Sequence, residues 1–551
     1  MNFRFRICHL KYLFFIFLFL FFLFPSFTFA LSVGQEVKFN IDSFYDLNLR
    51  DRISAILIKI TNQLYFFADK DWWQSLDTQT KNDLEISIYN LSVEFERNIY
   101  PKLTQTFGSE PKPGIDKDER IFVLIHPMNP DVGGYSNSCD LFPKIQCPRS
   151  NEREIIYLNS RHIGKPMAKV FLAHEFMHLI QLNQKDVLRN ISEETWLSET
   201  RAEYVSTFLG YDDVYQGSNL ERRVKNFLSS PQDSLTDWQN KISDYGVINL
   251  FTQYLVDNYG IKVLIDSLQS NKVGIESINY ALKKNNYDTD FSQIFKDWLI
   301  ANLVNDCSLG EKYCYKNPAL KSLKIVPEIN FSPMGGESIL TLFKTIKDFS
   351  GDWQKFVGGY GNLTLEFDGQ NNAIFDVSYL ICDKSNLCQI KFLPLDANQD
   401  GKISISDFDK NYSSLTLITF SKTKTSDFDG QNPSYSYSIK ITFNKKTEIS
   451  TSSVPTTTIS CRQILNNLRY GMRSPEVRCL QEFLKSQGPE IYPEGLVTGY
   501  FGPLTLAAVK RFQQKYWQEI LTPWGLTKAQ PTGIVGPTTR SKINQLLQSQ
   551  L

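Results

Sequence analysis

Two of the five histidines in this chain stand four residues apart, in the pentapeptide His-Glu-Phe-Met-His at residues 174–178. On a helix this spacing places both side chains on one face, so His174 and His178 can point at one metal ion. A catalytic zinc takes three protein ligands and keeps a fourth position for water. Glu199, some twenty residues downstream, is the natural third ligand, and Glu175 can accept a proton from that water. We therefore expect two helices that meet at these side chains. The alternative is a buried helix whose histidines make ordinary core hydrogen bonds.

The two expected helices have recognisable ends. Gly164 and Pro166 precede the first, which is apolar nearly all round and therefore buried. Ser192 is the expected cap of the second helix and Gly210 its end. Glu199 and Glu203 share one face, so one can ligate while the other holds the outer N–H of a histidine. Upstream, residues 119–126 and 154–158 are predicted strands, and the apolar run at 121–125 predicts a central one.

Together these motifs resemble the gluzincin metallopeptidases, and within them the hyicolysin-like peptidases. The stretches that carry the resemblance are Ala-His-Glu-Phe-Met-His at 173–178, Trp-Leu-Ser-Glu at 196–199, Ala-Glu-Tyr at 202–204, Asp-Val-Gly-Gly-Tyr at 131–135, Asp-Tyr-Gly at 244–246 and the run 250–255. The resemblance covers roughly residues 50–320. It implies an α+β zincin-type fold with the active-site helix under a mostly antiparallel sheet, catalytic zinc and peptide hydrolysis. It also implies that Glu203 orients His174, where the alternative is an exposed acid near a helix end.

Peptide hydrolysis also needs a donor for the oxyanion that forms in the transition state. Tyr245 is our candidate, and the alternative is that it only packs. We expect Glu175 to remove a proton from the attacking water and return it to the leaving amine.

The N-terminus has the pattern of a secretion signal. Arg4, Arg6 and Lys11 precede an unbroken apolar run at 13–24, and we predict cleavage after Ala30. The run is shorter than the roughly 20 residues of a membrane-spanning helix. An uncleaved membrane anchor is the alternative, and residues 31 to about 50 are a candidate propeptide.

The cysteines agree with export to an oxidising compartment. Cys8 falls in the signal, and the other eight form close sequential pairs. We predict four local disulfides: Cys139 with Cys147, Cys307 with Cys314, Cys382 with Cys388, and Cys461 with Cys479. A second zinc cluster is the rival interpretation, but no Cys-x-x-Cys pair or nearby histidine supports it. With 59 Lys and Arg against 59 Asp and Glu, and no basic tract with interleaved aromatics, nucleic acid is not an expected partner.

Residues 321–447 are predicted to form a β-sandwich. Apolar residues alternate with polar ones from 435 to 443, which is typical of a strand with one buried face. Within this region, residues 396–407 follow a calcium-loop pattern with Gly401 at its sixth position. The candidate ligands are Asp396, Asn398, Asp400, the carbonyl of Lys402, Ser404 and Asp407. The loop resembles those of dockerins, but one loop does not imply docking. A structural Ca²⁺ is the hypothesis, and a solvated turn is the alternative.

A Ser/Thr-rich linker is expected at 448–460, followed by a compact module at 461–551. The module repeats a Thr-Gly-x-x-Gly-Pro-x-Thr pattern at 498–505 and 532–539. Each copy leads into a predicted helix, at 503–516 and 537–547, and a further helix is predicted at 475–487.

The module resembles the three-helix bacterial peptidoglycan-binding domain. The match lies in Leu-Arg-Tyr-Gly at 468–471, Val-Arg-Cys-Leu-Gln at 477–481, the 499–505 turn, and the pairs 508–509 and 512–513; residues 517–531 are a longer insertion. This implies attachment to peptidoglycan, and the alternative is a spacer domain. The chain is therefore expected to have a signal at 1–30, a zinc metallopeptidase domain at 31–320, the sandwich, the linker and the module.

We expect a secreted or wall-associated zinc endopeptidase that cleaves protein. Two alternatives remain: a lytic peptidase that cleaves peptidoglycan cross-links, and a non-catalytic wall-bound binding protein.

Overall fold

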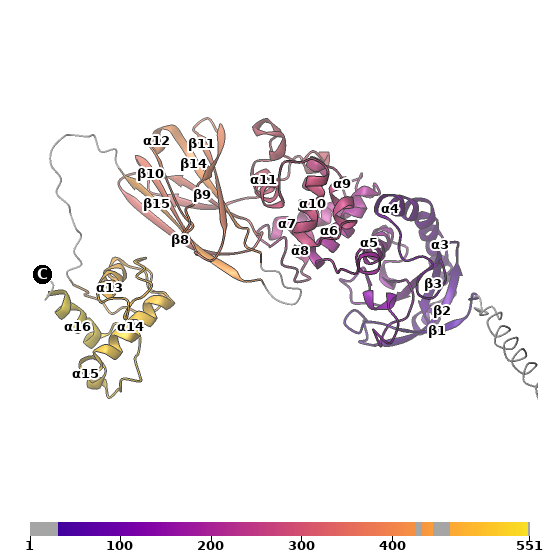
Figure 1. Cartoon of the computed structure of the whole chain (residues 1–551), viewed down its shortest axis with the longest axis horizontal. Helices are drawn as coiled ribbons and strands as arrows, with labels where there is room; N and C mark the ends of the chain where they lie inside the picture. The colour runs from indigo at the N-terminus through magenta and orange to yellow at the C-terminus, as the bar shows by residue number, and fades with distance from the viewer. Residues whose placement is uncertain (1–30, 425–431, 445–462, 549–551) are drawn as a thin grey trace, which may run out of the picture. The chain divides into compact units, whose positions relative to one another are not determined.

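The computed structural model describes residues 31–424, 432–444 and 463–548 (Figure 1). The chain divides into two compact units, Met1–Thr447 and Glu448–Leu551. The predicted signal and the predicted linker lie outside the described residues. In the described ranges, no helix combines the length and the apolar character needed to cross a membrane.

The first unit begins with a six-stranded sheet in the order β1-β2-β3-β4-β6-β5. Its strands are Glu36–Asn40, Arg52–Ile60, Leu64–Asp69, Ile121–His126, Gly134–Ser136 and Ile155–Asn159, numbered β1 to β6 along the chain. Three of the five strand pairings are antiparallel, in keeping with the expected mostly antiparallel sheet, but the sheet is mixed because β3, β4 and β6 run parallel. Parallel neighbours require long crossover connections. The crossover between β3 and β4 carries the helices α2 (Lys70–Ser75), α3 (Thr78–Glu94) and α4 (Tyr100–Phe107).

Strand β4 is central, as its apolar run predicts, and every one of its residues is buried. Strand β1 belongs to the folded unit, because Phe39 is only 1% exposed in the core on one side of the sheet. The segment considered as a propeptide therefore includes a strand of this sheet.

The active-site helix of the prediction is α5 (Met167–Leu182), and the second is α6 (Thr195–Phe208). Helix α6 begins after Glu194, so the prediction that Ser192 caps it is wrong. The Ser192 hydroxyl donates instead to Asp186. Five more helices complete this part (Figure 1): α7 (Asn219–Ser229), α8 (Ile242–Tyr259), α9 (Lys262–Leu268), α10 (Gly274–Lys284) and α11 (Phe291–Val304).

Two further sheets follow in the same unit. One has the order β13-β10-β15-β8 and the other β12-β11-β14-β9-β7. The strands are β7 (Glu328–Ser332), β8 (Ser338–Lys347), β9 (Asp352–Gly358), β10 (Asn362–Gly369), β11 (Phe375–Asp383), β12 (Cys388–Leu393), β13 (Asp400–Ile405), β14 (Tyr412–Ser421) and β15 (Ser434–Asn444), with the short α12 (Phe408–Asn411) before β14. Side chains of both sheets form one core, and β15 alternates between buried and exposed residues as predicted.

These sheets share apolar contacts with the helices. The ring of Phe295 on α11 lies 5.3 Å from that of Phe349 and 5.2 Å from that of Phe420. Trp353 donates from its indole N–H to the carbonyl of Leu299. The helical part and the two-sheet part are therefore packed together within one unit.

The second unit contains α13 (Pro475–Ser486), α14 (Pro503–Lys515), α15 (Trp517–Ile520) and α16 (Pro537–Gln548). Its internal repeat is visible in the hydrogen bonds. The Gln481 side chain donates to Thr498, the carbonyl of Tyr500 and Thr505, and the Gln513 side chain donates to Thr532, the carbonyl of Ile534 and Thr539. Each buried glutamine thus fastens one Gly-Pro turn to the preceding helix.

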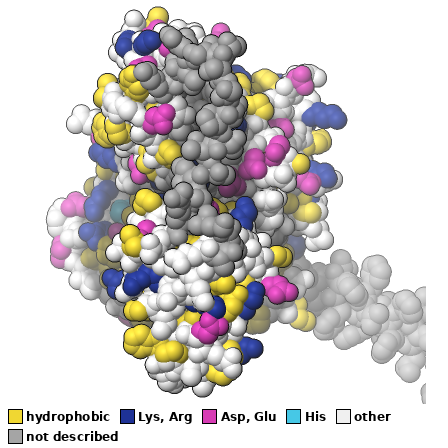
Figure 2. Space-filling model, turned by 90° about the vertical axis from the view of Figure 1, so that its left-hand side faces the viewer, with side chains coloured by type: hydrophobic (Ala, Val, Ile, Leu, Met, Phe, Trp, Pro, Cys, Tyr) yellow, Lys and Arg dark blue, Asp and Glu magenta, His cyan; other side chains and the backbone are white. Residues whose placement is uncertain are grey.

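Three predicted disulfides are confirmed: Cys139–Cys147, Cys307–Cys314 and Cys382–Cys388. The fourth prediction involves Cys461, which lies outside the described residues. On the face drawn in Figure 2, basic and acidic side chains are interspersed, in keeping with the balanced charge of the whole chain.

Candidate metal centre

Helices α5 and α6 bring His174, His178 and Glu199 together. The Nε2 atoms of the two histidines are 3.2 Å apart. Glu199 Oε2 lies 3.3 Å from His174 Nε2, and Glu199 Oε1 lies 3.4 Å from His178 Nε2. Within the part of the chain that the structure describes, this is the one group of three or more His, Cys, Asp or Glu side chains close enough to share an ion.

The spacing of these atoms fits a tetrahedral zinc. With Zn–N and Zn–O distances of roughly 2.0–2.1 Å, tetrahedral ligand atoms are about 3.3 Å apart. Glu199 Oε2 is buried and has no hydrogen-bond partner, as expected of an atom that is free to bind a cation. The three side chains remain 13–16% exposed, so protein does not enclose them completely.

The outer nitrogens of both histidines have partners that hold the rings in place. His178 Nδ1 lies 3.2 Å from the Ser198 hydroxyl. His174 Nδ1 lies 3.6 Å from Glu203 Oε1, as the resemblance implied but beyond ordinary hydrogen-bond length. Partners at Nδ1 favour the tautomer whose Nε2 lone pair faces the centre. Sequence reasoning missed Ser198, although it directly precedes Glu199.

Glu203 is a buried carboxylate in a polar cradle. Arg223 on α7 donates to both of its oxygens, at 2.7 and 2.5 Å, and Asn219 donates at 3.2 Å. Burial raises the pKa of Glu203, but the charge and hydrogen bonds of Arg223 outweigh it and lower the pKa to about 2. Glu203 therefore stays ionised beside His174. Nothing in the local sequence pattern pointed to Arg223.

Replacing Arg223 by Ala is expected to destabilise the first unit by about 3–5 kcal/mol, because it leaves a buried carboxylate without its counter-charge. Thermal unfolding should show a clear drop in Tm. In the double variant Glu203→Gln/Arg223→Ala no unpaired charge remains, so most of the Tm should return. If the single and double variants were equally destabilised, the stabilising role of the ion pair would be refuted.

The register of α5 against α6 is set by polar contacts at their interface. The Gln181 side chain donates to the carbonyl of Ser198 at 2.9 Å. Arg201 on α6, only 1% exposed, donates to the side-chain oxygen of Gln181 at 3.3 Å. These contacts fix the two helices beside the ligand side chains.

Glu175 points from α5 toward strand β5. A Cβ on Gly134 would lie 2.6 Å from the carbonyl of Tyr157 and 3.2 Å from Glu175 Cγ, so only glycine lets β5 approach this closely. Burial raises the pKa of Glu175 to about 7, further raised by the charge of Glu199 and opposed by His174 and a hydrogen bond from Ser136. A carboxyl with a pKa near neutrality is suited to general base chemistry.

Two tyrosines stand near these carboxylates. Burial and the charges of Glu199 and Glu203 raise the pKa of Tyr245, whose ring lies 4.4 Å below the guanidinium of Arg223. Its hydroxyl donates to Asn240 at 3.2 Å, so a role as oxyanion donor stays a prediction. Burial, Asp42, Glu175 and Glu199 raise the pKa of Tyr45, which stacks on Tyr135 of β5 at 4.7 Å. Sequence reasoning missed Tyr45, because its loop is distant from the motifs along the chain.

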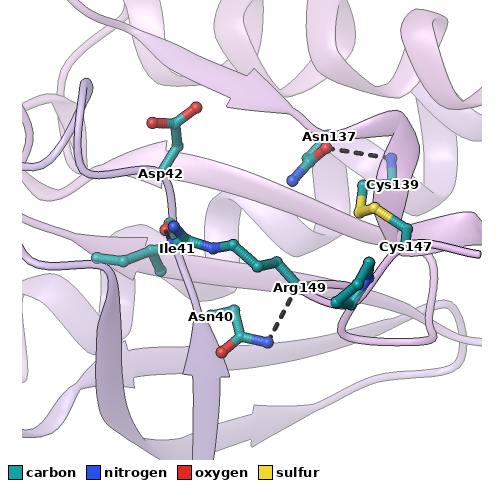
Figure 3. Close-up of a pocket in the computed structure, with 8 residues that line it drawn as sticks. Asn40, Ile41, Asp42, Asn137, Cys139, Cys147 and Arg149 are labelled. Carbon is teal, nitrogen blue, oxygen red and sulfur yellow. Dashed lines mark hydrogen bonds between the residues drawn. A yellow bond between two sulfur atoms is a disulfide. The ribbon is translucent and has the colours of Figure 1, made fainter. Parts of the chain in front are cut away.

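A cavity of about 540 Å³ lies beyond the end of β5 (Figure 3). Its lining includes Asn137, Asp42, Arg149 and the Cys139–Cys147 disulfide. The cavity does not include the three candidate ligands. Asn137, which lines the cavity, directly follows Ser136, and Ser136 forms a hydrogen bond with Glu175.

Half of the predicted calcium loop at 396–407 is extended backbone. Asp400–Ile405 is strand β13, paired with β10, and an extended run of this length spans about 17 Å. It separates Asp396 from Asp407. Asp396 accepts hydrogen bonds from the N–H groups of Asn398 and Asp400, and the Lys402 side chain bonds Glu366. Ser404 lies on the strand opposite Thr364. A calcium site at this loop stays a prediction.

Comparison with known families identifies the C-terminal domain. Residues 473–519 match the family described as "Putative peptidoglycan binding domain". The second unit therefore carries a peptidoglycan-binding domain, and with the disulfides this suggests an extracellular or cell-wall location. No peptidase family matches the chain, and no curated protein matches it.

Among solved structures, the pre-peptidase C-terminal domain of collagenase from Bacillus anthracis is 10% identical, covers 21% of this chain and 96% of its own, and has a TM-score of 0.15. A mitogen from Yersinia pseudotuberculosis is 16% identical, covers 21% and 97%, and has a TM-score of 0.14. The periplasmic g-type lysozyme inhibitor PliG of Aeromonas hydrophila is 8% identical, covers 21% and 97%, and has a TM-score of 0.13. These scores are too low to establish a shared fold, so no property is carried over.

Proposed function

We propose that this protein is a secreted zinc metallopeptidase held at the cell wall by its peptidoglycan-binding domain. The observation that carries the proposal is the arrangement of His174, His178 and Glu199, whose ligand atoms have the mutual spacing of a tetrahedral zinc site. The resemblance of the same motifs to gluzincins supports it.

We assign the following roles to the residues of the proposed site. Zinc, when bound by the two histidines and Glu199, supplies a Lewis acid that makes water acidic near neutral pH. Glu175 takes a proton from the attacking water and returns it to the leaving amine nitrogen. Glu203, kept ionised by Arg223, and Ser198 hold the histidine rings. Tyr45 and Tyr245 are the candidate donors to the developing oxyanion.

The position of β5 supports a peptide as substrate. Strand β5 is the last strand in its sheet, paired with β6 on one side. The backbone of an edge strand can pair with an extended peptide. Because Gly134 of this strand approaches Glu175, a peptide paired there would pass the proposed general base.

Cleavage of a mixed peptide library by the mature chain tests the proposal. We expect cleavage from the zinc-loaded protein, no cleavage after chelation, and recovery when zinc is added back. Calcium alone should not restore activity. A folded, zinc-loaded chain that cuts none of the peptides would contradict a general peptidase.

A second candidate function is cleavage of peptidoglycan cross-links, which the peptidoglycan-binding domain favours by placing the site on that polymer. Incubation with purified sacculi separates the two. Release of uncross-linked muropeptides without cleavage of the peptide library would favour the lytic peptidase. The absence of both products would favour the non-catalytic binding protein.

A further inference from the structure

The insertion in the peptidoglycan-binding domain exposes a tryptophan. Residues 517–531 form the short α15 and a turn at Thr522–Trp524, outside or at the end of the family match. Ile520 and Leu521 are each 1% exposed and anchor the insertion in the core. Trp524 is 61% exposed, more than any other aromatic side chain in the described part of the domain.

Trp524 is held in a fixed orientation. Its indole N–H donates to the Thr538 hydroxyl at 2.9 Å, and that hydroxyl donates to the carbonyl of Ile520 at 2.9 Å. The relay joins the insertion to the first turn of α16. In the first repeat the position equivalent to Thr538 is Leu504, so this relay belongs to the second repeat alone.

Trp524 has the features of an aromatic side chain that binds a ligand. A large apolar ring whose polar edge is already bonded presents its face to solvent with few rotamers to lose. A pyranose ring has an apolar C–H face of matching shape. The domain around it, residues 463–548, contains ten Lys and Arg and five Asp and Glu, a formal net charge of +5 that suits the acidic stem peptides of the same polymer.

We propose that Trp524 is the stacking platform for a sugar ring of the glycan strand of peptidoglycan. The proposal rests on the wall attachment in the proposed function and adds to it the contact residue and the part of the polymer that is bound. Thr538 is a positioning residue that orients the indole and does not touch the sugar.

Sedimentation of the full-length mature chain with purified sacculi tests this. We expect Trp524→Ala to weaken binding at least tenfold, Trp524→Phe to weaken it less because a ring face remains, and Thr538→Val to fall between wild type and Trp524→Ala. Leu465→Ala is the matched control, because Leu465 is 65% exposed in the same domain; its binding should be unchanged. Circular dichroism and Tm should be unchanged for Trp524→Ala and Trp524→Phe.

Competition identifies the ligand. Oligomers of N-acetylglucosamine should displace the wild-type chain from sacculi. Free stem peptides should displace no more of the wild-type chain than of the Trp524→Ala variant. Equal binding by wild type and a folded Trp524→Ala would overturn the inference alone. Displacement through Trp524 by stem peptide only would also overturn it. If the wild type does not bind sacculi, wall attachment itself fails and the inference with it.

Discussion

Glu175→Gln is expected to lower kcat/KM for peptide cleavage by about 10²–10⁴-fold, the usual contribution of a general base. The substitution keeps the size of the side chain and removes its ability to accept a proton. Because Glu175 is not one of the three ligands, the variant should still bind one zinc per chain. Steady-state cleavage of the best library peptide, with zinc content measured by atomic absorption, gives both quantities.

The control is the same Glu-to-Gln substitution at an exposed position outside the site. Glu276→Gln changes an exposed glutamate on α10, whose side chain is 76% exposed, and should leave kcat/KM unchanged. Burial raises the pKa of Glu175, so its carboxylate is costly to bury and the neutral Gln should not destabilise the fold. A zinc-loaded Glu175→Gln protein with normal activity would refute the role of Glu175.

Glu199→Ala is expected to abolish zinc binding at concentrations that saturate the wild type. The two remaining histidines cannot supply the three-ligand set of a catalytic zinc. Zinc stabilises the state that binds it, by about 2.7 kcal/mol at a free concentration of 100 times Kd. The wild-type Tm should therefore rise with added zinc, and the Tm of Glu199→Ala should not.

This measurement does not depend on activity. It tests the metal site even if the substrate is never found. Glu276→Ala should keep the zinc-dependent rise in Tm. A Glu199→Ala protein that gains as much Tm from zinc as the wild type would show that Glu199 is not a ligand.

Local patterns in the sequence were sufficient for the elements of the site. The spacing of His174 and His178 and the apolar surroundings predicted a buried helix, and α5 is one. The apolar run at 121–125 predicted the central β4. The two Gly-Pro turns predicted the starts of α14 and α16. In each case the information lies within one turn or one strand of the chain.

Other predictions failed or remained open where a contact outside the predicted motif decides the outcome. Ser192 is a good capping residue, but it bonds Asp186 and α6 begins after Glu194. Residues 396–407 match a dockerin-like calcium loop that ends in Asp407 where EF-hand loops have Glu, yet pairing with β10 makes Asp400–Ile405 a strand. A local sequence pattern does not show which of its backbone groups will form hydrogen bonds with another strand.

The sequence by itself determined three disulfide pairs and the C-terminal domain, and it predicted the proposed ligand set and general base, because each depends on residues close together in the chain. Only the tertiary structure decided which groups surround them. Arg223 reaches Glu203 from another helix, Tyr45 comes from the loop between β1 and β2, and Thr538 orients Trp524 across the insertion. Such contacts follow from packing between elements, and no periodicity along the chain records them.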